Sequence, residues 1–244
     1  MQLRVLVYNV RGFRDGLDRV LGVVEPEEPD VVLLSETGAR RTLGRFAEAL
    51  GMAAAGDPLS PFRRRVKNAV LIRPPWRVIS HRLHRFPRSE RFYPRGALIA
   101  QLGRTGERIW ATSVHLGLHP RERRRHAEEL ADVVRGLPGP VVIGGDLNET
   151  PEGRAVRHLA ARFWDVWATA SGPEGEAAGH TFPAADPSAR IDYLFVSDGF
   201  QVERAFVPHA APVRAASDHR PLVAELRLGV GEPPSLSGRN AWPL

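Results

Sequence analysis

Residues 141–151 read VVIGGDLNETP. An apolar run followed by two glycines, a carboxylate and an amide predicts a buried strand that ends directly on Asp146 and Asn148. An ionised carboxylate beside a buried apolar run is costly unless another group pairs with it or a metal binds it. Gly, Asp and Asn also dominate ordinary turns, so this stretch taken alone is better explained as a simple turn.

The same arrangement recurs along the chain, where apolar runs end or begin on residues that can act on a metal or a phosphate. Each such residue has an ordinary explanation when taken singly, as a turn residue, a helix cap or a hydrogen-bonded strand histidine. Several of them at one kind of position point instead to a shared site. They are Asn9 in VLVYNV, Glu36 in VVLLSE, His115 in ATSVHL, Asp192 in RIDYLFV, and Asp218 and His219 in ASDHRPL.

Short apolar or alternating runs flanked by Gly, Pro, Asp or Arg predict ten strands, and helical periodicity predicts four helices. Strands that follow one another directly over residues 68–115 should pair antiparallel, and intervening helices elsewhere allow parallel pairing. The expected strands are 3–9, 30–36, 68–73, 77–81, 97–102, 108–115, 141–146, 191–197, 202–208 and 220–228. The expected helices are 16–24, 39–50, 120–137 and 153–162.

This pattern favours a mixed α/β fold with two sheets and helices outside them. The helix at 120–137 has one apolar face, and its arginine-rich opposite face is expected to be solvated without a partner. No linker divides the chain, so residues 1–228 are expected to form one domain. Residues 170–189 are expected to be a loop, and the Pro/Gly-rich residues 229–244 a tail.

Composition excludes several classes of protein. With 43% hydrophobic and 25% charged residues, the 244-residue chain has an ordinary globular balance. It has no cysteine, which excludes disulfides, a cysteine nucleophile and cysteine-bound metals. No apolar run approaches the ~18–20 residues needed to span a bilayer. The N-terminal MQLRVLVYNV alternates like a strand rather than a secretory signal. We therefore expect a cytoplasmic protein, and a monomer.

The chain is basic, with 34 Lys+Arg against 28 Asp+Glu and a net charge of +6. A basic chain often meets nucleic acid or anionic lipid. Lys67 is the single lysine, however, so a compositional bias toward arginine explains the charge equally well. Two arginine-rich segments, 63–67 and 81–95, are expected near the site, and Phe86, Phe92 and Tyr93 in the second could stack on bases.

In their order and spacing, VYNV, the strand-final Glu36, SVHL, GGDLNETP, RIDYLF and SDHRPL resemble the endonuclease/exonuclease/phosphatase (deoxyribonuclease I-like) superfamily. The resemblance covers roughly residues 3–228. It implies an α/β fold, a four-layer α/β/β/α sandwich with two mixed β-sheets packed face to face. Ser35 stands where many members have glutamine, and His115 where abasic-site endonucleases have a tyrosine-containing motif.

The resemblance also implies a metal and a place for the substrate. Glu36 would be the main metal ligand, with Asn9 beside it and Asp218 helping to hold the ion. Hard oxygen ligands in a chain without cysteine suit Mg²⁺, or Mn²⁺, rather than zinc. Asn68 and Arg95 lie where loops could reach the mouth of the site, and we expect them to contact substrate, although Arg95 could equally be solvated without a ligand.

The expected catalytic residues are His115, Asp146, Asn148, Asp192 and His219. By resemblance, Asp146 orients or deprotonates the attacking water, and Asn148 holds the phosphate or the nucleophile. Asp192 bonds one ring nitrogen of His219, so that the other can bind a phosphate oxygen. His115 contacts the phosphate or protonates the leaving group. Which of His115 and Asp146 acts as acid or base stays open.

The leading hypothesis is a Mg²⁺-dependent phosphodiester hydrolase, a nuclease that cuts DNA or RNA by in-line attack of water. The same machinery also suits a phosphomonoesterase or a lipid phosphodiesterase, similar to inositol phosphatases or sphingomyelinases. A third hypothesis is a non-catalytic phosphate-binding module. The partner is nucleic acid or another phosphate ester, and loops rather than fold choose among these substrates.

Overall fold

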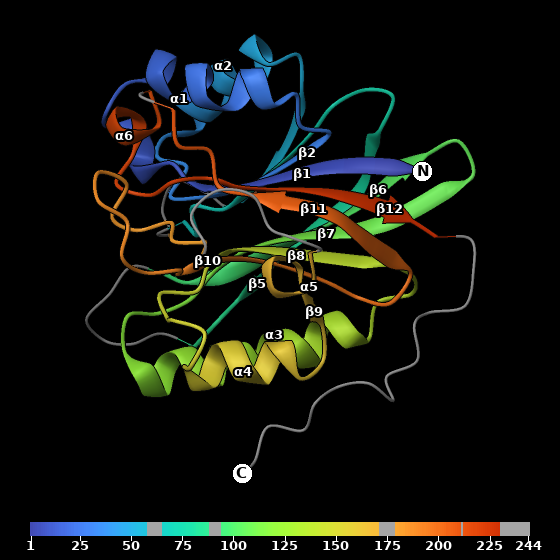
Figure 1. Cartoon of the computed structure of the whole chain (residues 1–244). Coiled ribbons are helices and arrows are strands. Elements are labelled where there is room, and N and C mark those ends of the chain that lie inside the picture. Colours follow the sequence, from blue (N-terminus) through green and yellow to red (C-terminus); the bar gives the residue numbers. More distant parts are fainter. Residues whose placement is uncertain (58–64, 88–93, 171–178, 211, 230–244) are drawn as a thin grey trace.

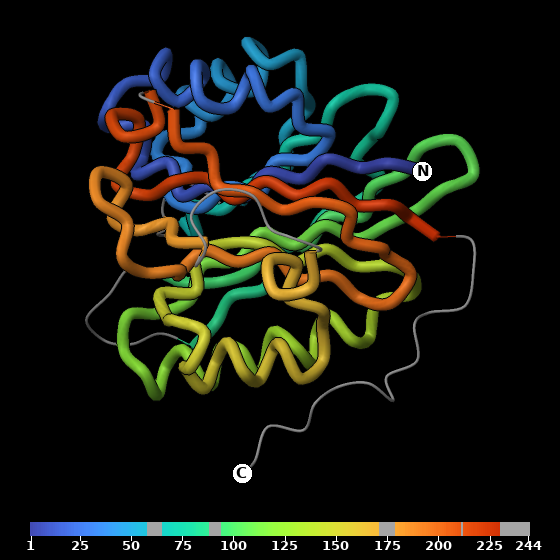
Figure 2. The backbone as a smooth tube through the Cα atoms, in the orientation of Figure 1, coloured from blue at the N-terminus to red at the C-terminus, as the bar shows by residue number. Residues whose placement is uncertain are grey.

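Two six-stranded sheets pack face to face in the computed structural model, and helices cover both outer faces (Figures 1 and 2). Each sheet contains one parallel strand pair among antiparallel ones, so both are mixed. The expected four-layer α/β/β/α sandwich is therefore confirmed. The residues that the structure describes are 1–57, 65–87, 94–170, 179–210 and 212–229.

The first sheet contains the strands β1 (Gln2–Asn9), β2 (Val31–Ser35), β3 (Ala53–Gly56), β4 (Ala69–Ile72), β11 (Phe200–Phe206) and β12 (Leu222–Leu228). Their order is β11–β12–β1–β2–β4–β3. The outer face is covered by the helices α1 (Leu17–Val24), α2 (Arg40–Ala49) and α6 (Val213–Ala216), at the top of Figure 1. Two short 3₁₀ turns, η1 (Arg11–Phe13) and η2 (Glu25–Glu27), follow β1 and α1.

The second sheet contains the strands β5 (Arg77–Arg85), β6 (Gly96–Arg104), β7 (Glu107–His115), β8 (Val141–Asp146), β9 (Trp164–Asp165) and β10 (Asp192–Val196). Their order is β5–β6–β7–β8–β10–β9. The outer face carries the helices α3 (Pro120–Arg135) and α4 (Arg154–Ala160), at the bottom of Figure 1. The short helix α5 (Val166–Thr169) packs against β10 and β11.

Strand β1 shows why the sequence folds into layers. Its side chains alternate, so Leu3, Val5 and Val7 lie in the core between the sheets, while Leu6 and Tyr8 pack under the outer helices. All five are at most 1% exposed. Burying a side chain of this size contributes about 1.5–3 kcal/mol, so an unbroken apolar strand requires cover on both faces.

The two glycines of the GGD stretch lie inside β8, so the interpretation of this stretch as a simple turn is wrong. A Cβ on Gly144 would meet Val7 and Leu33 of the facing sheet. Gly145 has φ of +156°, and a Cβ there would collide with the backbone of Val114. Only glycine lets β8 pass this close to its neighbours and carry Asp146 to the sheet edge.

The described elements match all ten expected strands and four expected helices within a few residues, with β5 longer and β11 earlier than expected. The sequence pattern did not predict β3, β9, α5 and α6. β3 is an alanine-rich edge strand of low intrinsic β-propensity, and the other three are at most four residues long, too short to show a period.

One pairing expectation was wrong. Direct succession predicted antiparallel pairing throughout residues 68–115, but β4 and β5 belong to different sheets. The chain crosses from one sheet to the other at residues 73–76, where Trp76 is buried in the core between them. β5, β6 and β7 do pair antiparallel, as expected.

Several sequence expectations fall outside the described residues: those for Arg63, Arg64, Phe92 and Tyr93, residues 171–178 of the expected loop and the tail from residue 230. Phe86 is described, and its expected role in stacking on bases is wrong. It is 4% exposed and stacks on the ring of His126 in the core beneath α3. Among the described helices, none is long and apolar enough to cross a membrane.

Candidate active site

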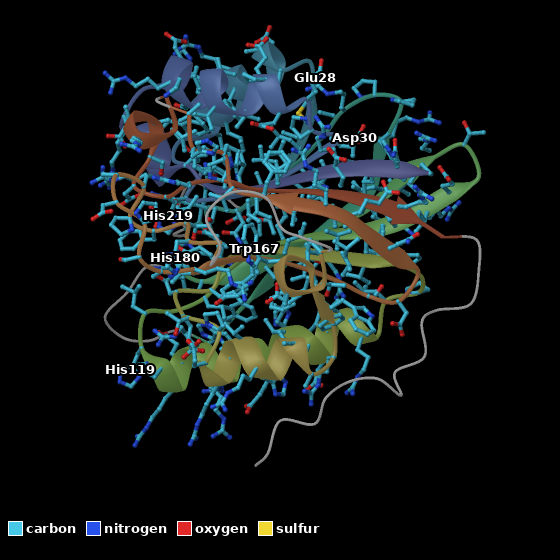
Figure 3. The ribbon with its side chains drawn as sticks, viewed as in Figure 1. Glu28, Asp30, His119, Trp167, His180 and His219 are labelled. Carbon is cyan, nitrogen blue, oxygen red and sulfur yellow. The ribbon has the colours of Figure 1, made fainter. Side chains whose placement is uncertain are left out.

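The expected site residues meet at one edge of the sandwich, where four strands end and four begin. Strands β1, β2, β7 and β8 end there, and their neighbours β4, β6, β10 and β12 start there, because antiparallel neighbours run in opposite directions. Asp146 is paired in register with His115 on one side and Asp192 on the other. Packing of β1 against β8 and β10 adds Asn9 to this group. In Figure 3 this edge is on the left, where His219 is labelled.

Asp146 is the centre of the site and is 1% exposed. Its Oδ1 accepts a hydrogen bond of 2.8 Å from the amide of Asn148, and its Oδ2 accepts one of 3.0 Å from Asn9 Nδ2. The same Oδ2 lies 3.3 Å from His115 Nε2 and 3.8 Å from His219 Nε2. Burial opposes its ionisation, but the two histidines and the Asn148 amide hold the pKa of Asp146 well below its usual range. The carboxylate is thus charged at neutral pH and surrounded by donors.

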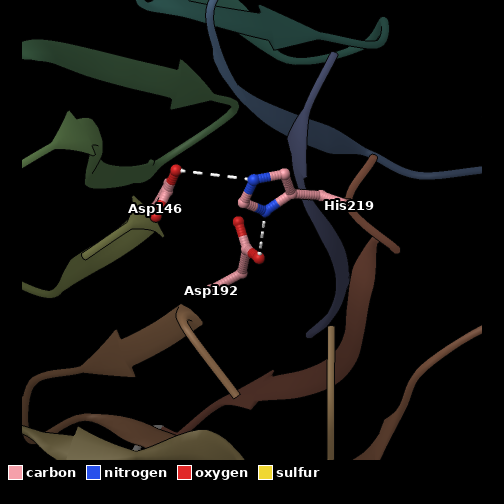
Figure 4. A group of neighbouring side chains, drawn as sticks. All are labelled: Asp146, Asp192 and His219. Atoms are coloured by element: carbon pink, nitrogen blue, oxygen red, sulfur yellow. Dashed lines mark hydrogen bonds and ion pairs between the residues drawn. The ribbon is translucent and has the colours of Figure 1, made fainter. Parts of the chain in front are cut away.

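Asp192 and His219 form a buried pair beside Asp146, as Figure 4 shows. His219 Nδ1 lies 2.8 Å from Asp192 Oδ2, and His219 and Asp192 are 5% and 0% exposed. Burial opposes the charge of the imidazolium. The negative charge and hydrogen bond of Asp192 outweigh this effect, and the charges of Asp146 and Asp218 act in the same direction. Together they raise the pKa of His219 to about 10. The ring is therefore an imidazolium at neutral pH, and Nε2 carries a proton toward Asp146.

This pair predicts how stability depends on pH. The pKa of His219 rises from 6.5 to about 10 on folding, so protonation favours the folded state. The stabilisation should be complete below about pH 6.5 and should fall as the pH rises toward 10. Each unit of pKa shift corresponds to about 1.4 kcal/mol, so the loss should amount to a few kcal/mol. Urea unfolding of the metal-free protein at several pH values would measure it.

The matched variant for this measurement is His219→Gln, which fills similar space and cannot become an imidazolium. Its unfolding free energy should change less than that of the wild type across the same pH window. Equal pH dependence in the two proteins would show that His219 does not titrate in this range.

Arg95 and His115 lie against each other on the far side of Asp146. Arg95 Nη1 is 2.6 Å from each ring nitrogen of His115. Burial lowers the pKa of Arg95, while the nearby carboxylates of Asp146, Glu36 and Glu122 oppose this. The structure therefore brings Arg95 into the site, as expected for a residue that contacts a phosphate.

Asn68 is buried and joins the two sheets. Its amide nitrogen donates to the carbonyl oxygens of Gly96 (3.0 Å) and Ser113 (2.9 Å), both in the second sheet, while Asn68 itself precedes β4 of the first. Both amide protons are thus used by the backbone, and only Oδ1 is left for other contacts. The expectation that Asn68 binds substrate stays a prediction, limited to that oxygen.

Glu36 follows β2 and turns away from the sheet. Its φ is 55°, in the left-handed region that costs a non-glycine residue roughly 1–2 kcal/mol. Within the described ranges, its carboxylate makes no hydrogen bond or salt bridge. Strain of this kind at a free carboxylate is typical of functional positions.

The donor set at this edge fits a hard cation. Glu36 offers a free carboxylate, and Asn9 Oδ1 accepts one hydrogen bond, of 3.0 Å from the amide of Arg11, and keeps a second lone pair. One carboxylate, one amide oxygen and substrate phosphates make a set that Mg²⁺ accepts, because this ion keeps several waters. Asp218 was expected to help hold the ion, but its Oδ2 pairs with Arg11 Nε at 3.3 Å. Its role as a metal ligand stays a prediction.

A second group of donor atoms, from Asp146, Asp192 and His219, lies within 4.8 Å and could hold a metal ion. Its chemistry is less suited to one. It includes an imidazole nitrogen, and His219 Nδ1 already lies 2.8 Å from Asp192 Oδ2. Oxygen ligands also suit Mg²⁺ better than imidazole. Two groups at this edge could thus hold a divalent ion: Glu36 with Asn9, through oxygen atoms alone, and Asp146 with Asp192 and His219.

Three residues of the site were not predicted from the sequence. Arg11 pairs with Asp218 and holds Asn9 through its amide. Ser217 Oγ donates 2.7 Å to the carbonyl of Asn9, which ties the segment before β12 to the end of β1. Arg11 directly follows the VYNV motif, and Ser217 lies within ASDHRPL. Their closeness in sequence to predicted site residues is therefore the signal that could have found them. Thr181 could not be found this way: its Oγ1 accepts a hydrogen bond of 3.3 Å from the Asp192 amide, from the segment that leads into β10, and it belongs to no predicted motif.

The chain is similar to known proteins in its family pattern and in its fold. A family model described as the endonuclease/exonuclease/phosphatase family matches residues 6–219. No curated protein sequence matches the chain. Among solved structures, an endonuclease/exonuclease/phosphatase protein from Bacteroides vulgatus superposes with a TM-score of 0.82 at 20% identity, covering 94% of this chain and 100% of that one.

Two further solved structures carry functional names. A mannosyl-6-phosphatase from Bacteroides thetaiotaomicron VPI-5482 has a TM-score of 0.77 at 19% identity, with 92% and 99% of the two chains covered. D. rerio TDP2, complexed with a single-strand DNA product, has a TM-score of 0.75 at 18% identity, with 93% and 99% covered. At such identities the likeness shows the fold alone.

Proposed function

From the premise that the chain belongs to the endonuclease/exonuclease/phosphatase family, we propose that it is a divalent-metal-dependent hydrolase of phosphodiester bonds in nucleic acid. The observation that carries the proposal is the buried group around Asp146. There an ionised carboxylate, an imidazolium and an arginine converge beside the free carboxylate of Glu36. Such a set can activate water and neutralise a phosphate at the same place.

In the proposed reaction, Asp146 accepts a hydrogen bond from the attacking water and takes its proton as the new P–O bond forms. The bond between phosphorus and the leaving oxygen breaks at the same time, and that oxygen takes a proton from His115 or from solvent. His219 donates from Nε2 to a non-bridging phosphate oxygen, and Asp192 keeps the ring charged and oriented. Arg95 and His115, on the other side of Asp146, face the phosphate or the leaving oxygen. A divalent ion held by Glu36 and Asn9, Mg²⁺ or Mn²⁺, supplies positive charge to the phosphate oxygens when bound.

Nucleic acid is the proposed substrate because the chain is basic and because TDP2, which shares the fold, was solved with a DNA product. The second candidate is a phosphomonoesterase, which the fold of the mannosyl-6-phosphatase supports. A nucleic-acid strand extends well beyond the phosphate that reacts, whereas a sugar phosphate does not. A panel of single-stranded DNA, RNA and sugar phosphates, assayed with Mg²⁺ and with Mn²⁺, separates them.

The metal assignment predicts that excess chelator abolishes hydrolysis and that Mg²⁺ or Mn²⁺ restores it. Glu36→Gln should lower kcat/KM at a fixed ion concentration by about 10²- to 10³-fold, the range found when a charge-stabilising group is removed. The titration of activity against the ion should also shift to higher concentrations. Glu48→Gln, on the exposed face of α2, is the matched control and should change neither. Full activity in chelator would exclude a metal mechanism.

A further inference from the structure

A groove of about 670 Å³ lies between the first half of α3 and the start of α4, on the outer face of the second sheet. Four arginines line it: Arg121, Arg124 and Arg125 from α3, and Arg154 from α4. The exposed placement of Arg121, Arg124 and Arg125 agrees with the expected solvated face of this helix, whereas Arg123, expected on the same face, is 12% exposed and pairs with Glu149. The gathering of the four arginines around one groove does not follow from that expectation, because Arg154 comes from a different helix.

The charges of this groove are not balanced within the protein. Two carboxylates lie in it, but Glu128 pairs with Arg124 at 2.8 Å, and Glu149 is held by Arg123 (3.3 Å) and by the Ala155 amide (2.8 Å). The guanidinium groups of the other three arginines have no partner within the described residues; these are Arg121, Arg125 and Arg154. Three unpaired positive charges around one groove repel one another and attract an anion.

The groove begins where the active site ends. Asn148 belongs to the site, and the next residue, Glu149, lines the groove. Asn148 Nδ2 also donates to the carbonyl of Leu116, on the loop that leads from His115 into α3. In Figure 3, His119 at the start of α3 and His219 lie on the same side of the molecule. Leu118 on this loop is 48% exposed and offers an apolar contact for a sugar or base.

We propose that this groove binds the phosphate backbone of a nucleic-acid strand, at phosphates next to the one that is cleaved. The inference rests on the proposed function and makes it more specific: the substrate is a strand of several nucleotides rather than a small ester. A strand carries one phosphate per about 3.4 Å of rise, so a groove with three unpaired arginines can contact more than one phosphate. The planar guanidinium also matches the phosphate oxygens in pairs.

The test compares two triple variants that remove the same charge. The groove variant is Arg121→Gln/Arg125→Gln/Arg154→Gln. The control variant is Arg45→Gln/Arg77→Gln/Arg108→Gln, on α2 and at the starts of β5 and β7, where the arginines are also exposed. Binding of a labelled single-stranded DNA of about 20 nucleotides, longer than common single-strand sites, is measured by fluorescence anisotropy in chelator at several salt concentrations.

The groove variant should bind the strand at least about tenfold more weakly than the control. Its log–log salt slope should be smaller by about 0.7 for each phosphate that the variant no longer neutralises. The ratio of kcat/KM for the long strand to that for a dinucleotide should fall in parallel. Melting temperatures report whether each variant is folded. Equal binding by the groove variant and the control would overturn the proposal.

Two other outcomes separate this inference from the proposed function. If the wild type hydrolyses no ester but binds the strand through these arginines, the groove stands and the proposed activity fails. If the groove variant loses binding to vesicles of phosphatidylcholine and phosphatidylserine while strand binding is unchanged, the groove serves an anionic lipid surface and the inference is wrong.

Discussion

Replacing Asp146 with asparagine is expected to lower kcat by about 10³-fold or more, within the range for loss of a positioned general base. The side chain keeps its size, but a neutral amide cannot take a proton from water. Its nitrogen would also stand where Oδ2 now faces Asn9 Nδ2 at 3.0 Å and His115 Nε2 at 3.3 Å. The N–H groups of the new amide and of its neighbours would then face each other in a buried position without an acceptor. Single-turnover kinetics with saturating metal would measure the loss.

The matched control is Asp132→Asn on α3, whose side chain is 72% exposed and pairs with Arg135. It removes one carboxylate without touching the site, and kcat should stay within about twofold because exposed ion pairs contribute little. Thermal melting of both variants separates a defect in the chemistry from a defect in folding. If Asp146→Asn is folded and retains wild-type kcat, Asp146 is not the base.

Much of this site could be predicted from the sequence because chain polarity and strand period act locally. An apolar run that stops at a carboxylate, such as VVIGGD, fixes which edge of a strand carries Asp146. The register of β7, β8 and β10 then aligns three such ends, with His115 and Asp192 opposite Asp146. The first step is local, whereas the second also requires that three strands far apart in the sequence pair with one another.

The remaining features arise from contacts between segments that are distant in the sequence. Asn68 could be placed before a strand, but not in its position between the sheets, which depends on how β4 packs on β6 and β7. Phe86 stood among arginines, which favoured an exposed ring, yet α3 covers it. The pairing of Arg11 with Asp218 joins residues from opposite ends of the chain, and no local pattern indicates it.

The largest non-additive effect is expected from Asp192 and His219. His219→Ala should lower kcat/KM by about 10³-fold, because it removes a charged donor to the phosphate. Asp192→Asn should lower it nearly as much at pH 8, since Asp192 is the main reason that the ring stays protonated. The double variant should be little worse than His219→Ala alone, because residues that act as one unit do not give additive losses.

The pH profile distinguishes this coupling from a merely structural role. In the wild type, His219 stays charged up to about pH 10, so its protonation does not limit activity near neutrality. In Asp192→Asn, the pKa of His219 should fall toward its ordinary value of 6.5, and activity should be partly recovered below that pH. His219→Ala should show no such recovery. A loss in Asp192→Asn that is the same at pH 5.5 and pH 8 would mean that Asp192 holds the fold of the site and does not tune its charge.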